Sequence, residues 1–279
     1  MPAQPTCALA LSFPCIMGVV NVTPDSFSDG GRFFAAGDAL AQGLALAREG
    51  AALIDIGGES TRPGADPVSE AEELRRVLPV VEALAGRVGV PISVDTMKAE
   101  VARRALAGGA ALINDVSALR FDPGMAAVIA EAGCPVCLMH MHGEPRTMQD
   151  APRYDDVVDE VLQFLEERMV FALAQGIHED QIMVDPGIGF GKTVDHNLAL
   201  LRELRRFTAL GRPVVLGTSR KRFLGAILGA EPTARTIGSV ATTVVGLLAG
   251  VHVFRVHDVK PNFEALRVGL AVLEGAPAA

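Results

Sequence analysis

Short apolar runs recur along the chain, and each ends at a polar residue before a Gly-rich or polar loop and an amphipathic segment. The runs are too short for helices and apolar throughout, as expected of strands that are buried on both faces. The pattern therefore predicts eight strands, at 16–22, 53–56, 92–94, 111–113, 136–139, 182–184, 214–216 and 251–256.

Segments with helical spacing lie between these runs, and one follows the last run. They predict helices at 35–49, 70–84, 98–107, 123–132, 154–175, 195–209, 236–249 and 263–273. Asp122 and Pro123 are typical of a helix start, and glycines stand where most of the helices should end. Eight strand–helix units in 279 residues predict an α/β protein, a single-domain (β/α)8 TIM barrel over residues 1–279. An open, doubly wound sheet is the alternative.

A polar residue stands at the carboxyl end of every predicted strand, which is where such barrels place their chemistry. These positions are Asn21, Asp55, Asp95, Asn114 with Asp115, His140, Asp185, the segment from Gly217 to Lys221, and Arg255 with His257 and Asp258. Some of them can cap helices or bond the backbone. Because burying unpaired polar groups is costly, a complete ring of them predicts one polar site.

The residue types in this ring suit a planar nitrogen heterocycle. The carboxylates of Asp95 and Asp185 can accept from ring N–H and amino groups, and the amide of Asn114 can both donate and accept. Lys221 can donate to a ring carbonyl or nitrogen, and Arg255 can lay its guanidinium on a ring face. A basic patch suited to an anion such as diphosphate comes from Arg62, Arg255 and His257.

Charge and hydropathy narrow the choice of partner. The chain carries 25 Lys and Arg against 33 Asp and Glu, a formal net charge of −8. This balance argues against nucleic acid and anionic membranes as partners. No run approaches the ~18 apolar residues of a membrane span, and the first residues lack the charged start of a signal peptide. We therefore expect a soluble, cytoplasmic protein that acts on small molecules.

Three motifs suggest chemistry that their surroundings do not support. Segment 187–193 looks like a phosphate loop, but Pro186 stands where a Walker A motif needs its first glycine. Cys134 and Cys137 have redox or zinc spacing, but they would face opposite sides of a strand, so we expect structural thiols. His140 and His142 share a strand face without a third ligand, which argues against zinc.

Two loops, 21–31 and 57–64, are rich in Gly, Pro and polar residues, a composition typical of a lid that orders on binding. They carry NVTPDSFSDGG and GGESTRPG, and the chain also contains ISVDT, INDVSA, LMHMHG, DPGIGFGKT, LGTSRKRFLG and RVHDV. In these segments the chain resembles the dihydropteroate synthase family of folate biosynthesis. The segments occur in that family's order, from residue 16 to residue 258.

The resemblance implies an enzyme that joins 6-hydroxymethyl-7,8-dihydropterin diphosphate to 4-aminobenzoate and releases diphosphate, with Mg²⁺ as cofactor and a homodimer as the assembly. The pterin contacts that it implies are Asp95, Asn114, Met139, Asp185, Lys221 and Arg255, with Gly217 as a further substrate-binding residue. The implied contacts to diphosphate are Asn21, which also meets the metal, Thr61, Arg255 and His257. Those to 4-aminobenzoate are Arg62, Pro63, Phe190, Ser219 and Lys221, with Phe27 and Asp29 on the closing first loop. The implied catalytic residues are Asp29, Arg62 and Lys221.

The sequence leaves several points open. Asp29 could stabilise a cationic pterin methylene or help the amine of 4-aminobenzoate to lose its proton. Arg222 follows Lys221 where many relatives carry Ser, so Ser219 and backbone N–H groups could instead bind the aminobenzoate carboxylate. The alternative functions are a catalytically silent pterin-binding paralogue and a methyltetrahydrofolate-dependent corrinoid methyltransferase. The full set of polar residues argues against the first, and the two loops argue against the second.

Overall fold

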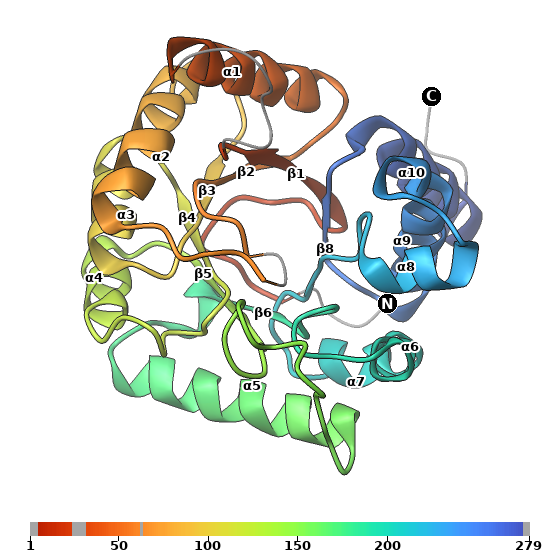
Figure 1. The fold of residues 1–279 in the computed structure, drawn as a ribbon. Coiled ribbons are helices and arrows are strands. Elements are labelled where there is room, and N and C mark those ends of the chain that lie inside the picture. The colour runs from red at the N-terminus through yellow and green to blue at the C-terminus, as the bar shows by residue number, and fades with distance from the viewer. Residues whose placement is uncertain (1–4, 24–31, 62–63, 276–279) are drawn as a thin grey trace.

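The computed structural model describes residues 5–23, 32–61 and 64–275. In this part of the chain eight parallel strands form a barrel within a ring of helices (Figure 1). The strands are β1 (Cys15–Asn21), β2 (Leu53–Gly57), β3 (Ile92–Asp95), β4 (Leu112–Asp115), β5 (Val136–Met139), β6 (Ile182–Asp185), β7 (Val215–Leu216) and β8 (Val253–Val256). Every predicted strand is present, and nearly all strand residues are buried, as their apolar sequences predicted.

The order of the strands distinguishes between the two predicted architectures. Hydrogen-bonded neighbours run β6-β5-β4-β3-β2-β1-β8-β7, so the first strand pairs with both the second and the last. A single bridge between Val184 and Val214 joins β6 to β7, where the Val184 N–H donates to the Pro213 carbonyl at 3.0 Å. The nearly closed ring confirms the (β/α)8 barrel and excludes the open sheet.

The helices follow the predicted alternation with local differences. They are α1 (Arg32–Arg48), α2 (Glu70–Leu84), α3 (Ala99–Ala107), α4 (Met125–Ala132), α5 (Val157–Ala174), α6 (Val194–Arg202), α7 (Leu204–Thr208), α8 (Arg222–Leu228), α9 (Thr236–Ala249) and α10 (Val259–Glu274). The segment predicted as one helix at 195–209 is broken at Glu203, and α8 was not predicted. Among the described residues, no helix is long and apolar enough to cross a membrane.

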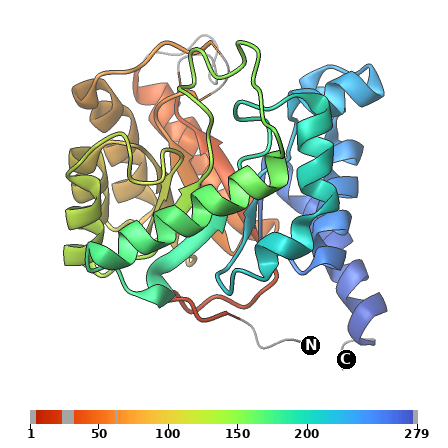
Figure 2. The ribbon, with the colours of Figure 1, turned by 90° about the horizontal axis from the view of Figure 1, so that it is seen from below.

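The interior of the barrel changes from apolar to polar along the strands. Its lower layer is a buried cluster made of Cys15, Met17, Leu53, Leu112, Cys137, Met183, Val215 and Val253. Segment 7–13 packs under this layer, and Figure 2 shows the N-terminal part of the chain at the end opposite to the loops that follow β2 and β5. Side chains along a strand point alternately into and out of the barrel. Two residues beyond the lower layer, the inward side chains are therefore those of Asp55, Asn114, Asp185 and Arg255. The strands therefore place polar groups above an apolar layer.

The two cysteines of the CxxC motif pack on different sides of the barrel wall, with Cys137 within β5 and Cys134 just before it. Cys137 belongs to the lower layer inside the barrel, whereas Cys134 packs in the core between the strands and the helices. Burial raises the pKa of both thiols, to about 11 for Cys134. Both side chains are therefore protonated, structural thiols at neutral pH.

Candidate active site

A buried ionic cluster occupies the centre of the barrel mouth. The Arg255 guanidinium, from β8, donates through Nε to Asp55 Oδ2 at 2.7 Å and through Nη2 to Asp95 Oδ2 at 2.8 Å. The Asn114 amide also reaches Asp55 Oδ2, at 3.4 Å. In the described structure the second oxygen of Asp55, Oδ1, is buried without a partner. The cluster thus offers more acceptors than its own donors satisfy.

Burial governs the charge of this cluster. It raises the pKa of Asp95 to about 7, with the Arg255 cation opposing the rise and the Asp55 carboxylate adding to it. Asp185 lies deep in the same mouth, where burial also raises its pKa although the Gly187 N–H donates to Oδ1 at 2.7 Å. Burial lowers the pKa of Arg255, but Asp55 and Asp95 outweigh it, so the net shift is upward. Arg255 is therefore a permanent cation held by two carboxylates.

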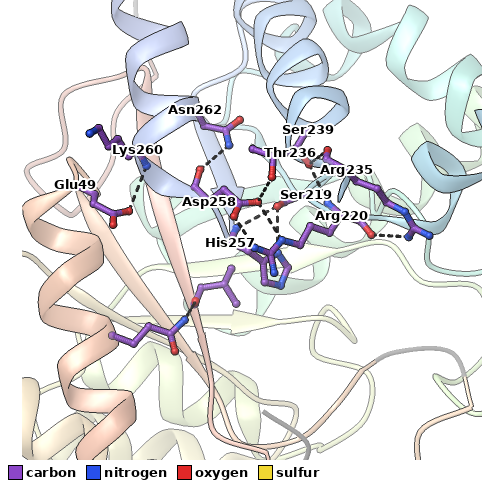
Figure 3. Close-up of polar contacts among 12 residues, drawn as sticks. Glu49, Ser219, Arg220, Arg235, Thr236, Ser239, His257, Asp258, Lys260 and Asn262 are labelled. Carbon is purple, nitrogen blue, oxygen red and sulfur yellow. Dashed lines mark hydrogen bonds and ion pairs between the residues drawn. The ribbon is translucent and has the colours of Figure 1, made fainter. Parts of the chain in front are cut away.

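Segment 217–221, which follows β7, is fixed by a network of side chains (Figure 3). Ser219 Oγ accepts from the His257 backbone N–H at 3.1 Å and lies 3.1 Å from His257 Nδ1. Arg220 has a positive φ of 58° and donates to Asp258, while its carbonyl accepts from Arg235 at 3.0 Å. Such a strained backbone persists where its surroundings hold it. The network therefore sets the direction of the neighbouring Lys221.

His257 departs from its predicted role as a cation in a basic patch. Burial lowers its pKa to about 3, and the nearby cations Arg255, Arg220 and Lys221 lower it further. The imidazole is consequently neutral at pH 7 in this structure. It can still donate one N–H to an anion, but it adds no positive charge before the anion arrives.

Lys221 and Phe190 form the outer side of the site. The Lys221 ammonium lies 3.8 Å from the centre of the Phe190 ring, a cation–π contact. Phe190 packs in a buried cluster with Met97, Val116, Met139, Met141 and Met148. An apolar wall thus stands beside the acceptors of the central cluster, as a flat heterocycle would require.

The buried side chain of Lys192 stabilises the loop that carries Phe190 by donating to its backbone carbonyls. Lys192 Nζ donates to the carbonyls of Gly187 and Phe190, at 2.9 and 3.1 Å, and lies 2.8 Å from His140 Nδ1. Burial lowers the pKa of Lys192 well below its usual value and that of His140 to about 2. A Cβ at Gly187 would lie 1.8 Å from the His140 carbonyl oxygen, so only glycine fits there. His140 thus supports this loop.

The remaining predicted residues are placed as follows. A Cβ at Gly57 would lie 3.7 Å from Asp95 Cβ and 3.8 Å from Asn21 Oδ1, so the Asn21 amide belongs to the same mouth. A Cβ at Gly217 would lie 3.9 Å from Asp185 Oδ2. Thr61 lies after β2, in segment 59–68. Phe27, Asp29, Arg62 and Pro63 lie outside the described residues.

The structure gives Asp55, a member of the predicted polar ring, a role that the sequence did not assign. Asp55 binds both Arg255 and Asn114, which makes it the centre of the ionic cluster. Its position at a strand end was the available signal, because it matched that of Asp95 and Asn114. Sequence could not show that Asp55 and Arg255 point at each other.

A cavity of about 500 Å³ is lined in part by Met97 and Met141, which belong to the buried cluster of Phe190. Residues of segments 59–68, 97–98, 117–121 and 141–146 line it, and none of the described predicted site residues does. We therefore identify the active site from the charged side chains that converge at the barrel mouth, and not from this cavity.

Comparisons with known proteins agree with this geometry. The model of the family described as pterin binding enzyme matches residues 17–257. The dihydropteroate synthase of Escherichia coli strain K12 is 49% identical over 266 residues, covering 95% of this chain and 94% of that protein. The structure of Xanthomonas albilineans dihydropteroate synthase with 4-aminobenzoic acid has a TM-score of 0.92 at 50% identity, covering 98% of this chain and 99% of that one. The same enzyme in complex with 7,8-dihydropteroate has a TM-score of 0.86 at 48% identity, with 95% and 96% covered.

Proposed function

The chain belongs to the dihydropteroate synthase family of pterin-binding enzymes, and we infer that it condenses 6-hydroxymethyl-7,8-dihydropterin diphosphate with 4-aminobenzoate to give 7,8-dihydropteroate and diphosphate. The observation that carries this inference is the surplus of buried acceptors at the barrel mouth. Asp95, Asn114 and Asp185 converge there beside an apolar wall. A pterin presents several ring and amino N–H donors, which is what such a set can bind.

The reaction needs positioning more than covalent catalysis. The C–O bond between the pterin methylene and diphosphate breaks, and its electron pair leaves with diphosphate. The electron-rich pterin ring delocalises the positive charge that develops on the methylene. The amine nitrogen of 4-aminobenzoate then attacks the methylene and loses a proton. The protein lowers this barrier by holding the two reactants close together and by accepting the charge of the leaving group.

Individual residues divide this work. Asp185 and Asn114 hold the pterin edge, Arg255 lies against its ring and borders the diphosphate, and neutral His257 donates to a diphosphate oxygen. Lys221 contacts both the pterin and the second substrate, which Phe190 and Ser219 also meet. Asp29 and Arg62 complete the proposed catalytic set, and Thr61, Phe27 and Pro63 complete the contacts to diphosphate and 4-aminobenzoate.

We propose Mg²⁺ as the cofactor, bound through Asn21 and diphosphate oxygens. The donor set fits this arrangement, because the Asn21 amide oxygen faces the mouth near Gly57 and Asp95. In the described residues, no group of three or more His, Cys, Asp or Glu side chains could hold a metal by itself. Mg²⁺ commonly binds through few protein ligands and substrate phosphates. When bound, it supplies positive charge to the leaving diphosphate.

A second copy of this chain is the proposed partner in a homodimer. Apolar side chains gather on one outer face made by α9 and α10, and they include Val245, Leu248, Val268, Val272 and Leu273, all exposed. Contiguous exposed apolar surface of this kind is typical of a protein interface. This α9–α10 face lies on the outside of the barrel, so assembly leaves the mouth open (Figure 1). A cytoplasmic location stays a prediction from the sequence.

The decisive experiment is an assay of diphosphate release with and without 4-aminobenzoate. We expect dihydropteroate, detected by mass spectrometry, only when both substrates and Mg²⁺ are present. A silent paralogue would bind the pterin substrate without forming product. A corrinoid methyltransferase would instead transfer a methyl group from methyltetrahydrofolate and ignore 4-aminobenzoate. Removing metal with a chelator should abolish product formation, and adding Mg²⁺ should restore it.

A further inference from the structure

Segment 59–68, which joins β2 to α2, is tied together by the side chain of its first residue. Glu59 Oε1 accepts from the backbone N–H of Val68, at 3.3 Å, so the carboxylate bridges the two ends of the segment. Thr61 lies between these ends, two residues after Glu59. One side chain therefore joins the two ends of a segment that begins two residues after Gly57 at the barrel mouth.

The other oxygen of Glu59 is anchored to the framework of the barrel. Glu59 Oε2 pairs with the ammonium of Lys98, and the same ammonium pairs with Glu73 Oε2. Lys98 immediately precedes α3, and Glu73 belongs to α2 and is fully buried. Exposed fractions of 11% for the side chains of Lys98 and Glu59 show that water screens these pairs little. Lys98 thus links the segment to two helices.

The charges in this triad depend on one another. Burial lowers the pKa of Lys98, but the bonds to Glu59 and Glu73 outweigh it and raise the pKa, so the ammonium stays charged. Removing the cation would leave two carboxylates together in a nearly dry environment, which is strongly unfavourable. Removing Glu59 instead leaves Lys98 and Glu73 as a matched pair. Variants of Glu59 therefore test the role of the triad with less damage to the fold than variants of Lys98.

Other contacts hold the segment where it approaches its neighbours. The Arg76 guanidinium donates to the Gly58 carbonyl at 2.8 Å, and the Gly64 N–H donates to the Pro145 carbonyl at 3.2 Å. A Cβ at Gly58 would lie 2.6 Å from Val77 Cγ2, so the backbone rests directly on α2. These contacts hold Gly58 and Gly64 independently of the Glu59 side chain, so we expect Glu59 variants to keep the fold.

We propose that Glu59 and Lys98 are positioning residues for the diphosphate and 4-aminobenzoate side of the active site. They act by fixing residues 59–61 and 64–68, and so Thr61, relative to the barrel mouth. They leave the pterin contacts unchanged, because Asp95, Asn114 and Asp185 belong to the strands themselves. This inference rests on the proposed function for its substrates, although the anchoring of the segment does not.

The test compares three variants with the parent protein. Glu59→Ala removes both contacts, whereas Glu59→Gln keeps one acceptor oxygen, which can serve either the Val68 N–H or Lys98 in place of the two carboxylate oxygens. The matched control is Glu100→Ala, which removes a carboxylate that pairs with Arg103 on the surface of α3. In Glu59→Ala we expect the KM for 4-aminobenzoate to rise about tenfold or more, the order of one lost buried hydrogen bond to a charged group. Glu59→Gln should recover part of this loss, and affinity for a pterin analogue should stay within about twofold in all three.

Amide hydrogen exchange supplies a readout that needs no substrate. The Val68 N–H should exchange faster in Glu59→Ala than in the parent, and at the parent rate in Glu100→Ala. Unchanged Val68 exchange and unchanged KM in a less stable Glu59→Ala protein would overturn the proposal and leave a purely structural ion pair. An equal loss of pterin affinity would overturn its selectivity. If the parent forms no dihydropteroate, the proposed function fails, while Val68 exchange still decides whether Glu59 anchors the segment.

Discussion

At the scale of single residues, the site is governed by carboxylates that are buried beside too few cations. Asp55 and Asp95 share the guanidinium of Arg255, while Asp185 relies on a backbone N–H. Buried acceptors without full partners are costly in the free protein. A ligand with several N–H donors removes that cost, so the same imbalance that destabilises the empty mouth favours the pterin.

Replacing Asp185 by Ala should remove pterin binding and preserve the fold. The change deletes an ionic acceptor that a buried pterin donor needs, which costs about 1.5–3 kcal/mol or more of binding free energy. Calorimetry with a pterin analogue measures the loss, and circular dichroism checks the fold. Asp195→Ala, an exposed carboxylate on α6, is the matched control and should bind normally. Unchanged affinity in Asp185→Ala would exclude this residue from the site.

Pterin affinity should also depend on pH through Asp95. Burial raises the pKa of this carboxyl to about 7, so the ionised acceptor predominates above pH 7 and is lost as the pH falls below it. We expect the affinity for a pterin analogue to decrease from pH 8 to pH 6. The analogue should have no titration of its own in this range. Asp95→Asn should bind more weakly and show a flat profile, and a parent profile that is equally flat would contradict the assignment.

At the scale of elements, the site depends on loops that are fastened by side chains from elsewhere in the barrel. Lys192 holds the loop of Phe190, and the network around Arg220 holds segment 217–221. These attachments join residues far apart in the sequence. They give the loops a defined shape before any substrate binds.

Replacing Lys192 by Met should loosen the Phe190 loop. It removes the Lys192 donor from the carbonyls of Gly187 and Phe190, although Gly187 keeps the bond from the Phe190 N–H. The loss should lower the free energy of unfolding by about 1–3 kcal/mol or more. Urea denaturation measures this change, and the KM for 4-aminobenzoate should rise if Phe190 contacts that substrate as proposed. Lys260→Met, at an exposed position of α10, should alter neither quantity. Equal stability of Lys192→Met and the parent would show that the lysine does not support the loop.

The sequence predicted the strands and most helices far better than the side-chain contacts that join them. Eight apolar runs with polar ends were enough for the barrel, because buried parallel strands produce that pattern in any such fold. The short helix α8 was missed, since its seven residues give too little periodicity. The strand ends likewise brought Asp95, Asn114 and Asp185 together. Neither the pairing of Asp55 with Arg255 nor the neutrality of His257 follows from a pattern, because both depend on distance and burial.

At the scale of the whole molecule, the α9–α10 face should control assembly. A lysine at Val272 or Val268, which are 79% and 65% exposed, would place a charge in the centre of the proposed interface. Light scattering should show a dimer for the parent protein and a monomer for Val272→Lys. Val170→Lys is the control, because Val170 is also 66% exposed but lies on α5. A parent protein that stays monomeric at high concentration would refute the homodimer.

The two substrates should bind in order, because their pockets have different origins. The proposed pterin contacts belong to strand ends that the barrel fixes by itself, whereas Phe27, Arg62 and Pro63 belong to Gly- and Pro-rich segments of the sequence. Diphosphate supplies the anion that can bring Thr61 and Arg62 towards the Asn21 end of β1. We therefore expect 4-aminobenzoate, and sulfonamides that mimic it, to bind strongly only after pterin and diphosphate.

Titration of a sulfonamide against the protein alone, with pterin, and with pterin, diphosphate and Mg²⁺ measures this order. Affinity should be highest in the third condition, and by linkage the sulfonamide should tighten diphosphate binding by the same factor. Arg62→Ala should weaken this coupling more than it weakens pterin binding, since the proposed pterin contacts lie on the strands. Equal affinity in all three conditions would mean that the aminobenzoate pocket exists before the pterin substrate binds, and that the two loops do not assemble it.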